Sequence, residues 1–109
     1  MAYYLTANYT PAALKALGEK PSNRREAAEK LLTAAGGKLL SFYRTTAEGP
    51  GVHVIFDADP VAAAAINAAL VASGACMDVK MGRLWTDDEV AAIRKKRAEI
   101  EAAYSPPGH

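Results

Sequence analysis

Few residues of this 109-residue chain could take part in acid–base or nucleophilic chemistry. Apart from its last residue it has one histidine, His53, and its single cysteine is Cys76. Because imidazole titrates near neutrality, His53 is a candidate general base or ligand-orienting group. The alternative is a half-buried histidine hydrogen-bonded to Tyr43, Thr45 or Thr6, which we favour because titratable groups mark function only loosely.

A candidate ligand site surrounds this histidine. Its residues are Tyr4, Thr6, Asn8, Tyr43 and His53. In such a site His53 would transfer a proton or orient a polar group of the ligand, with Tyr43 as the neighbouring hydroxyl and Asn8 as a second donor. Tyr4 and Tyr43 would line a pocket for a flat molecule, although aromatic residues at alternating strand positions are usually packing residues. The sequence leaves both roles open.

Three other chemistry-bearing residues point to structural roles. Asp78 and Lys80 project from one strand to the same face, where they could bind an anionic or polar ligand, but such a pair is more often a rim salt bridge. A thiolate needs a base or a positive neighbour, and Cys76 has only Lys80 nearby, so we interpret it as a structural thiol. No second histidine or nearby glutamate completes a metal-binding set around His53. We predict no metal and no cofactor.

Charge and motifs argue against nucleic acid as a partner. The 13 Lys and Arg residues nearly balance 12 Asp and Glu residues, for a net charge of +1. The basic run at 94–97 is followed at once by Glu99 and Glu101, which is typical of a solvated helix face. The segment 52–56 lacks the aromatic pattern with which ferredoxin-like RNA-binding domains stack bases. Gly36-Gly37 precedes a strand, so it is not a phosphate loop.

We expect a soluble cytoplasmic protein without a membrane segment. The uncharged run at 60–77 is dominated by alanine and broken by Gly74, so it does not predict a membrane span. The start, MAYYLTANYT, lacks the basic and long apolar regions of a signal peptide. A single cysteine cannot form an intrachain disulfide, which fits a reducing compartment.

The elements that must position these residues predict an α+β fold. Hydrophobic patterns predict strands at 2–9, 38–46, 52–56 and 76–84, with helices that follow the capping residues Thr10, Asn23, Asp59 and Thr86. The order β-α-β-β-α-β plus a C-terminal helix predicts a ferredoxin-like sandwich with strand order 4-1-3-2 and both main helices on one face.

We expect one domain over residues 1–104 and a disordered tail at 105–109. The uncharged first strand is predicted to be buried on both faces, and Arg24 of the second helix to face water.

The sheet face without helices needs an explanation. On the helix side, alternation places Tyr3, Leu5, Ala7, Leu40, Phe42, Val52, Val54, Phe56, Met77, Val79 and Met81. On the opposite side it places Tyr4, Thr6, Asn8, Ser41, Tyr43, Thr45, His53, Ile55, Asp78 and Lys80. A solvated face would carry more Lys and Glu, whereas a face that packs on a copy of itself around a partly polar cavity would have this mixed composition. We therefore expect a homodimer formed sheet to sheet.

Several short segments carry a family resemblance. They are YTP at 9–11, REA at 25–27, GGKL at 36–39, SFY at 41–43 and RLWTDDE at 83–89. In order and spacing they resemble the GYD-domain family, from about Tyr3 to about Arg94. The resemblance implies a dimeric α+β barrel and no assigned activity. The family's Gly-x-Tyr-Asp motif, in the hairpin before the third strand, is replaced here by Glu48-Gly49-Pro50-Gly51, so no functional residue carries over from it.

Two classes of function stay open. The first is a small homo-oligomeric domain that binds a small polar or aromatic molecule in the barrel between two sheets. The second is a cofactor-independent enzyme that uses His53, like the monooxygenases and isomerases that share this barrel, and it is supported by fold analogy alone. We also expect the outer face of the alanine-rich helix, near Ala64, Ala68 and Ala72, to touch either the C-terminal helix or another subunit.

Overall fold

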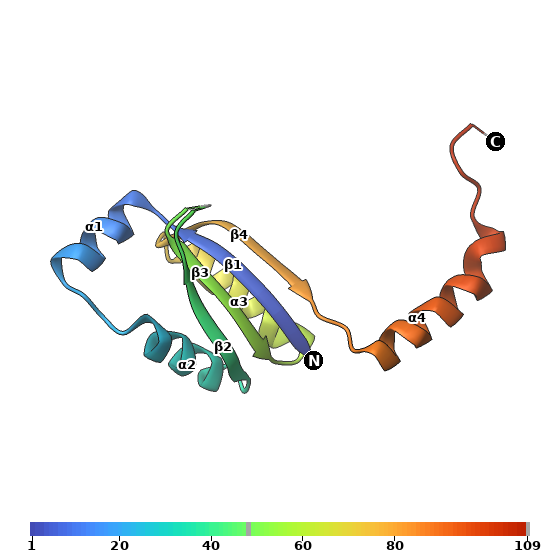
Figure 1. The fold of residues 1–109 in the computed structure, drawn as a ribbon, viewed down its shortest axis with the longest axis horizontal. Coiled ribbons are helices and arrows are strands. Elements are labelled where there is room, and N and C mark those ends of the chain that lie inside the picture. Colours follow the sequence, from blue (N-terminus) through green and yellow to red (C-terminus); the bar gives the residue numbers. More distant parts are fainter. Residues whose placement is uncertain (48, 109) are drawn as a thin grey trace.

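A computed structural model describes residues 1–47 and 49–108 as one four-stranded sheet with four α-helices (Figure 1). The elements are β1 (Ala2–Tyr9), α1 (Pro11–Glu19), α2 (Arg24–Ala34), β2 (Lys38–Thr45), β3 (Gly51–Asp57), α3 (Pro60–Ala72), β4 (Cys76–Arg83), α4 (Asp87–Ile100) and the 3-10 turn η1 (Glu101–Ala103). The strand order is β2-β3-β1-β4 with antiparallel neighbours, which confirms the predicted order and fold class.

The helices begin where the capping residues predict. The side chains of Thr10, Asn23, Asp59 and Thr86 each accept a hydrogen bond from the backbone N–H three residues later. Each such bond satisfies an N–H that has no partner within its own helix. Local sequence therefore accounts for the position of each of these four starts.

The core lies on one side of the sheet. Along β1, burial alternates strictly, with Tyr3, Leu5, Ala7 and Tyr9 buried and the residues between them half-buried. The predicted burial of this strand on both faces is therefore wrong for the single chain. α3 runs behind the sheet, and no helix crosses its front face (Figure 1). The core is completed by buried residues of β3, α2, α3 and the β3–α3 loop: Val52, Val54, Phe56, Leu32, Ala58, Ala63 and Ile66.

A bulge in β2 changes which residues face the core. Leu39 is paired with Phe56 and Ser41 with Ile55, so Leu40 is an extra residue between these two pairs. Because side chains alternate along a strand, one extra residue reverses the faces on one side of the bulge. Leu39 packs on the core, whereas Leu40 is 49% exposed, and the prediction of Leu40 on the helix side is wrong.

A second bulge, in β4, has the same effect. Lys80 is paired with Thr6 but Met77 with Asn8, and Asp78 has a positive φ of 53°. The predicted helix-side position of Met77 is therefore wrong, because Met77 is paired on the uncovered face and is 42% exposed. Cys76 takes its place beside Tyr9 and packs against the core.

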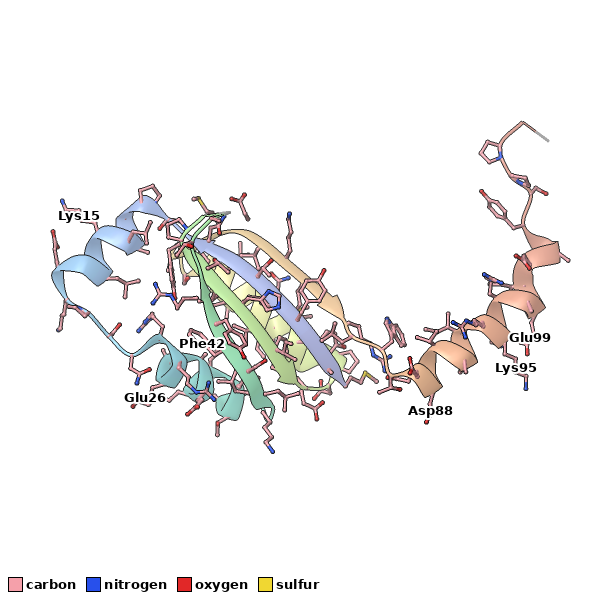
Figure 2. The ribbon with its side chains drawn as sticks, in the orientation of Figure 1. Lys15, Glu26, Phe42, Asp88, Lys95 and Glu99 are labelled. Carbon is pink, nitrogen blue, oxygen red and sulfur yellow. The ribbon has the colours of Figure 1, made fainter. Side chains whose placement is uncertain are left out.

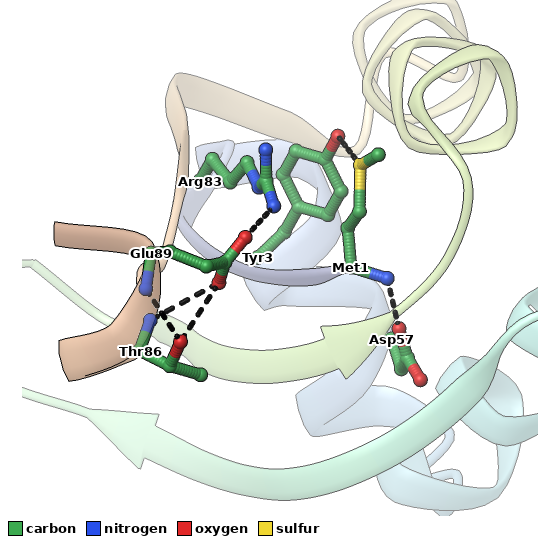
Figure 3. A network of polar contacts seen from close by, with 6 residues as sticks. All are labelled: Met1, Tyr3, Asp57, Arg83, Thr86 and Glu89. Atoms are coloured by element: carbon green, nitrogen blue, oxygen red, sulfur yellow. Dashed lines mark hydrogen bonds and ion pairs between the residues drawn. The ribbon is translucent and has the colours of Figure 1, made fainter. Parts of the chain in front are cut away.

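A network of polar contacts links the end of β4 to the start of α4 (Figure 3). Arg83 is ion-paired with Glu89, and its guanidinium lies 3.9 Å from the centroid of the Trp85 ring. Glu89 also accepts a hydrogen bond from the Thr86 backbone N–H at 3.1 Å, and Thr86 Oγ1 accepts one from the Glu89 N–H at 3.2 Å. This capping box and ion pair fix the direction in which α4 leaves the sheet.

α4 extends away from the rest of the chain. Asp88, Lys95 and Glu99 of this helix lie well away from the sheet (Figure 2), and none of its residues is buried. The radius of gyration is 17.7 Å, against about 13 Å for a compact domain of this length. In the single chain α4 does not lie on the outer face of α3 (Figure 1). Residues 105–108 are exposed, and His109 of the predicted tail lies outside the described residues.

Candidate functional site

The uncovered face of the sheet holds a hollow of about 440 Å³. It lies where β1, β3 and β4 meet the β2–β3 hairpin, on the side of the sheet opposite the core. Its lining is formed by Thr6, Ala7, Asn8, Thr45, Thr46, Ala47, Val52, His53, Asp78 and Lys80. Hydroxyl, amide, imidazole, carboxylate and ammonium groups thus converge on one cavity, which is the arrangement expected of a site for a small polar ligand.

Strand register places four of the polar residues in a row. Thr6 of β1 is paired with His53 of β3 on one side and with Lys80 of β4 on the other. His53 is paired in turn with Tyr43 of β2. Directly opposed side chains of neighbouring strands lie about 5 Å apart, so the row crosses the whole sheet. Thr6, His53 and Lys80 line the hollow, and Tyr43 stands at the end of the row, 65% exposed.

The bulge in β4 brings a carboxylate into the hollow. Asp78 is the one non-glycine residue with a positive φ among the described residues, a conformation that aspartate tolerates better than most side chains. Its Oδ2 accepts a hydrogen bond from Asn8 Nδ2 at 3.4 Å. No ion pair joins it to Lys80 within residues 1–47 and 49–108, so the predicted rim salt bridge is wrong. One carboxylate and one ammonium group therefore both face the hollow.

The β2–β3 hairpin forms one wall of the hollow. Thr45 Oγ1 donates a hydrogen bond to the Gly49 carbonyl at 3.0 Å. Gly49 has a φ of 121°, and a Cβ at this position would lie 2.6 Å from Asn8 Nδ2. This conformation favours glycine, and a side chain here would also displace the Asn8 amide. Glu48, the first residue in the place of the family motif, lies outside the described residues.

The structure brings together three of the five predicted site residues. Thr6, Asn8 and His53 line the hollow, whereas Tyr4 and Tyr43 share its face but not its lining. Tyr4 is paired with Gly82, and its ring lies where a Cβ at Gly82 would be, 2.6 Å from Cε1. Its ring thus covers a glycine of the edge strand.

The structure agrees with only part of the sequence interpretation of His53, whereas it agrees with the structural role given to Cys76. His53 is half-buried as expected, but no hydrogen bond joins it to Tyr43, Thr45 or Thr6 among the described side chains, so that part of the interpretation is wrong. Burial raises the pKa of the Cys76 thiol, although the charge of Arg24 opposes the shift. A buried thiol with a raised pKa is a poor nucleophile, in agreement with a structural role.

Sequence patterns missed part of the lining. Thr46 and Ala47 belong to the hairpin, where no strand or helix period applies. In the part of the chain that the structure describes, no group of three or more His, Cys, Asp or Glu side chains could hold a metal ion. Nor is any helix of that part long and apolar enough to cross a membrane.

The family of the chain follows from comparison with known families. The model of the GYD domain matches residues 3–94, which include the hollow and the four strands except Ala2. The chain therefore belongs to the GYD domain family, and the resemblance noted in its motifs is confirmed. No curated protein matches the chain.

Proposed function

We propose that this protein is a homodimer whose two sheets pack face to face and whose polar hollow binds a small polar or aromatic molecule between them. The observation that carries the proposal is the hollow itself, because it combines about 440 Å³ with convergent polar side chains on a face that no helix covers. Small-molecule sites are concave and hold a few well-placed polar groups.

The exposed apolar residues of the uncovered face support the proposal that a second copy of the chain packs on it. Leu40, Tyr43 and Met77 are 49%, 65% and 42% exposed, and Ile55 is half-buried between the paired strands. Exposed apolar side chains gathered on one face are typical of a surface that contacts another protein. The same patch on two copies is self-complementary under a two-fold axis, which is the commonest symmetry of soluble oligomers.

The detached C-terminal helix supports the same proposal. Val90, Ile93 and Ile100 recur at helical spacing, and the last two are 43% and 57% exposed. An isolated helix of 14 residues is marginally stable in water, so α4 needs a surface that its own chain does not provide. We propose that this surface belongs to the partner subunit.

The polar groups of the hollow indicate the chemistry of its ligand. Lys80 would hold an anionic or carbonyl oxygen, and His53 and Thr6 offer hydrogen bonds from neighbouring strands. The Asp78 carboxylate and the Asn8 side-chain carbonyl would accept hydrogen bonds from a donor group of the ligand. A molecule with both a donor and an acceptor fits this arrangement.

A ligand screen with three variants tests the proposal. A library of small polar and aromatic molecules is screened by thermal shift and confirmed by NMR on the wild type, His53→Gln, Lys80→Gln and Tyr4→Phe. Binding should be lost or weakened in the first two variants and kept in Tyr4→Phe, because Tyr4 lies outside the lining. Ligands that bind all four proteins equally, or no ligand at all, would contradict a site in this hollow.

Catalysis by His53 stays a prediction beside this one. A histidine base is usually oriented by a carboxylate or carbonyl on its other nitrogen. Within the described residues, no such bond to His53 is present. We therefore propose binding rather than proton transfer as the role of the site, together with a cytoplasmic location, which the single free cysteine favours.

A further inference from the structure

A second cavity lies on the other side of the sheet, between the strands and the helices. It has a volume of about 290 Å³, and its walls are formed mainly by apolar side chains of β1, β2, β3, α2 and α3. Phe42, Val54, Leu31 and Leu70 are among them. This cavity and the polar hollow lie on opposite faces of the sheet and share the lining residue Val52.

The strand order explains why this space is not filled. α2 packs along β2 and α3 along β4, and these are the two edge strands. Strands lie about 4.8 Å apart, so helices over the two edges of a four-stranded sheet are about 14 Å apart, beyond the 8–10 Å of packed helices. The residues that α2 turns toward the gap include Ala27 and Ala28, which are too small to close it.

One end of the cavity is polar and positively charged. Arg24 lies there, half-buried, and its Nε is fully buried without a hydrogen-bond partner. Tyr9 and Cys76 line the same end, and the charge of Arg24 reaches both of them. The prediction that Arg24 faces water is therefore wrong, because the β1 and β4 ends lie against the first turn of α2. Sequence spacing alone gives no signal for this contact.

The cavity contains no charge that balances Arg24. Its lining includes no Asp or Glu, and no ion pair of the described residues involves Arg24. Its neighbour Arg25, by contrast, is paired with Glu29 at 3.2 Å. A half-buried guanidinium without a partner is unfavourable, and a planar carboxylate is the group that best satisfies it.

We infer that this cavity is a binding site for a carboxylic acid with a hydrocarbon body, whose acid group pairs with Arg24 while its apolar part lies between α2, α3 and the sheet. The volume is at the lower end of the range of small-molecule sites, so the acid is small. Ser73 at this end already donates to the Leu70 carbonyl, which leaves the guanidinium as the main recognition group.

Octanoate and octanol are the probes, because they share the apolar body and differ in the acid. Calorimetry measures both against the wild type, Arg24→Gln, the matched control Arg25→Gln and Ala28→Phe, which fills the cavity. Octanoate should bind in a saturable way, about tenfold or more weakly to Arg24→Gln and equally well to Arg25→Gln. Ala28→Phe should bind neither probe, with its melting curve showing that it folds.

The location is measured on the wild type by methyl NMR. Octanoate should shift the Ile66 and Leu70 methyl signals and leave the His53 side of the sheet unchanged. Equal binding of octanol and octanoate, unaffected by Arg24→Gln, would overturn recognition of the acid. Absence of saturable binding, or shifts confined to the His53 side, would overturn the site without touching the proposed function of the other face.

Discussion

Single residues of this protein are constrained in ways that their types alone do not reveal. Asp78 adopts a positive φ and so turns its carboxylate into the hollow, and Arg24 is half-buried beside Tyr9. Strand alternation alone places Asp78 on the uncovered face, as predicted, but its positive φ and the burial of Arg24 depend on contacts that form only in the folded chain. His53, in contrast, was predicted from the sequence as half-buried on the uncovered face, because strand alternation and the charge pattern are local properties.

Gly51 should tolerate no side chain. A Cβ at this position would overlap the Ala7 carbonyl oxygen, at a distance far shorter than van der Waals contact. We expect Gly51→Ala to lower the free energy of unfolding by about 2–4 kcal/mol, measured by urea denaturation. Gly18→Ala is the control, because Gly18 lies in α1 with nothing within 4 Å of the added carbon. It should stabilise by up to about 1 kcal/mol, and equal losses in the two variants would be inconsistent with the close approach.

His53 should contribute little to stability, in line with a binding role. Since no side-chain hydrogen bond of the described residues is lost with it, we expect His53→Ala to lower the free energy of unfolding by less than about 1 kcal/mol. Phe56→Ala, which removes a ring that is 1% exposed, should lower it by about 3–5 kcal/mol. A loss of similar size at His53 would identify it as a core residue instead.

At the scale of secondary-structure elements, the sequence predicts where helices start better than it predicts the register in which strands pair. The four capping residues define the helix starts, since each cap acts within one turn. The bulges at Leu40 and Asp78 could not be predicted, because a bulge shows itself only against the paired strand. Of the residues that line the hollow, Asp78 lies at one of these bulges.

The start of α4 should depend on pH through Glu89. Its pKa is lowered, first by the backbone hydrogen bond from Thr86, and also by the charge of Arg83. A carboxyl group whose pKa is lower in the folded state stabilises that state above its unfolded pKa of about 4.3, and the effect is lost as the pH falls through the folded value. Hydrogen exchange at the N–H groups of α4 should therefore quicken in acid, relative to β3.

Glu89→Gln is the variant that isolates this effect. It keeps the shape of the side chain and removes its titration. We expect exchange in the first turn of α4 to be faster than in the wild type at neutral pH and to change little between neutral pH and pH 3, apart from the intrinsic exchange rate. A wild-type acid response that survives the substitution would assign it to another carboxyl group, such as Asp57, whose pKa is lowered by its bond to the N-terminal amine.

The apolar side of α4 should hold the dimer together. We expect Ile93→Glu to weaken dimerisation at least about tenfold, because a charge would enter the proposed interface. Lys95→Glu changes a charged residue on the opposite side of the same helix, about 200° around its axis from Ile93, and should leave the dimer intact. Sedimentation equilibrium measures both, and equal effects of the two substitutions would indicate that α4 acts through net charge alone.

At the scale of the whole molecule, the single chain is elongated and leaves one face of its sheet uncovered. Its longest dimension is 58 Å against a shortest of 24 Å, because α4 reaches beyond the sheet. The front of the sheet is uncovered and carries both apolar side chains and the polar hollow. The homodimer that we propose would explain these features together, since a second copy placed sheet to sheet would enclose the hollow between the two chains.

A crystal structure of the protein, purified without added ligand, tests this explanation most directly. It should contain two copies with their sheets facing, an interface of at least about 1,000 Å² in total, and an ordered small molecule or polar cavity beside His53 and Lys80. Uncovered sheet faces in solvent, or a hollow filled by the tyrosine and isoleucine side chains of a facing copy, would contradict it.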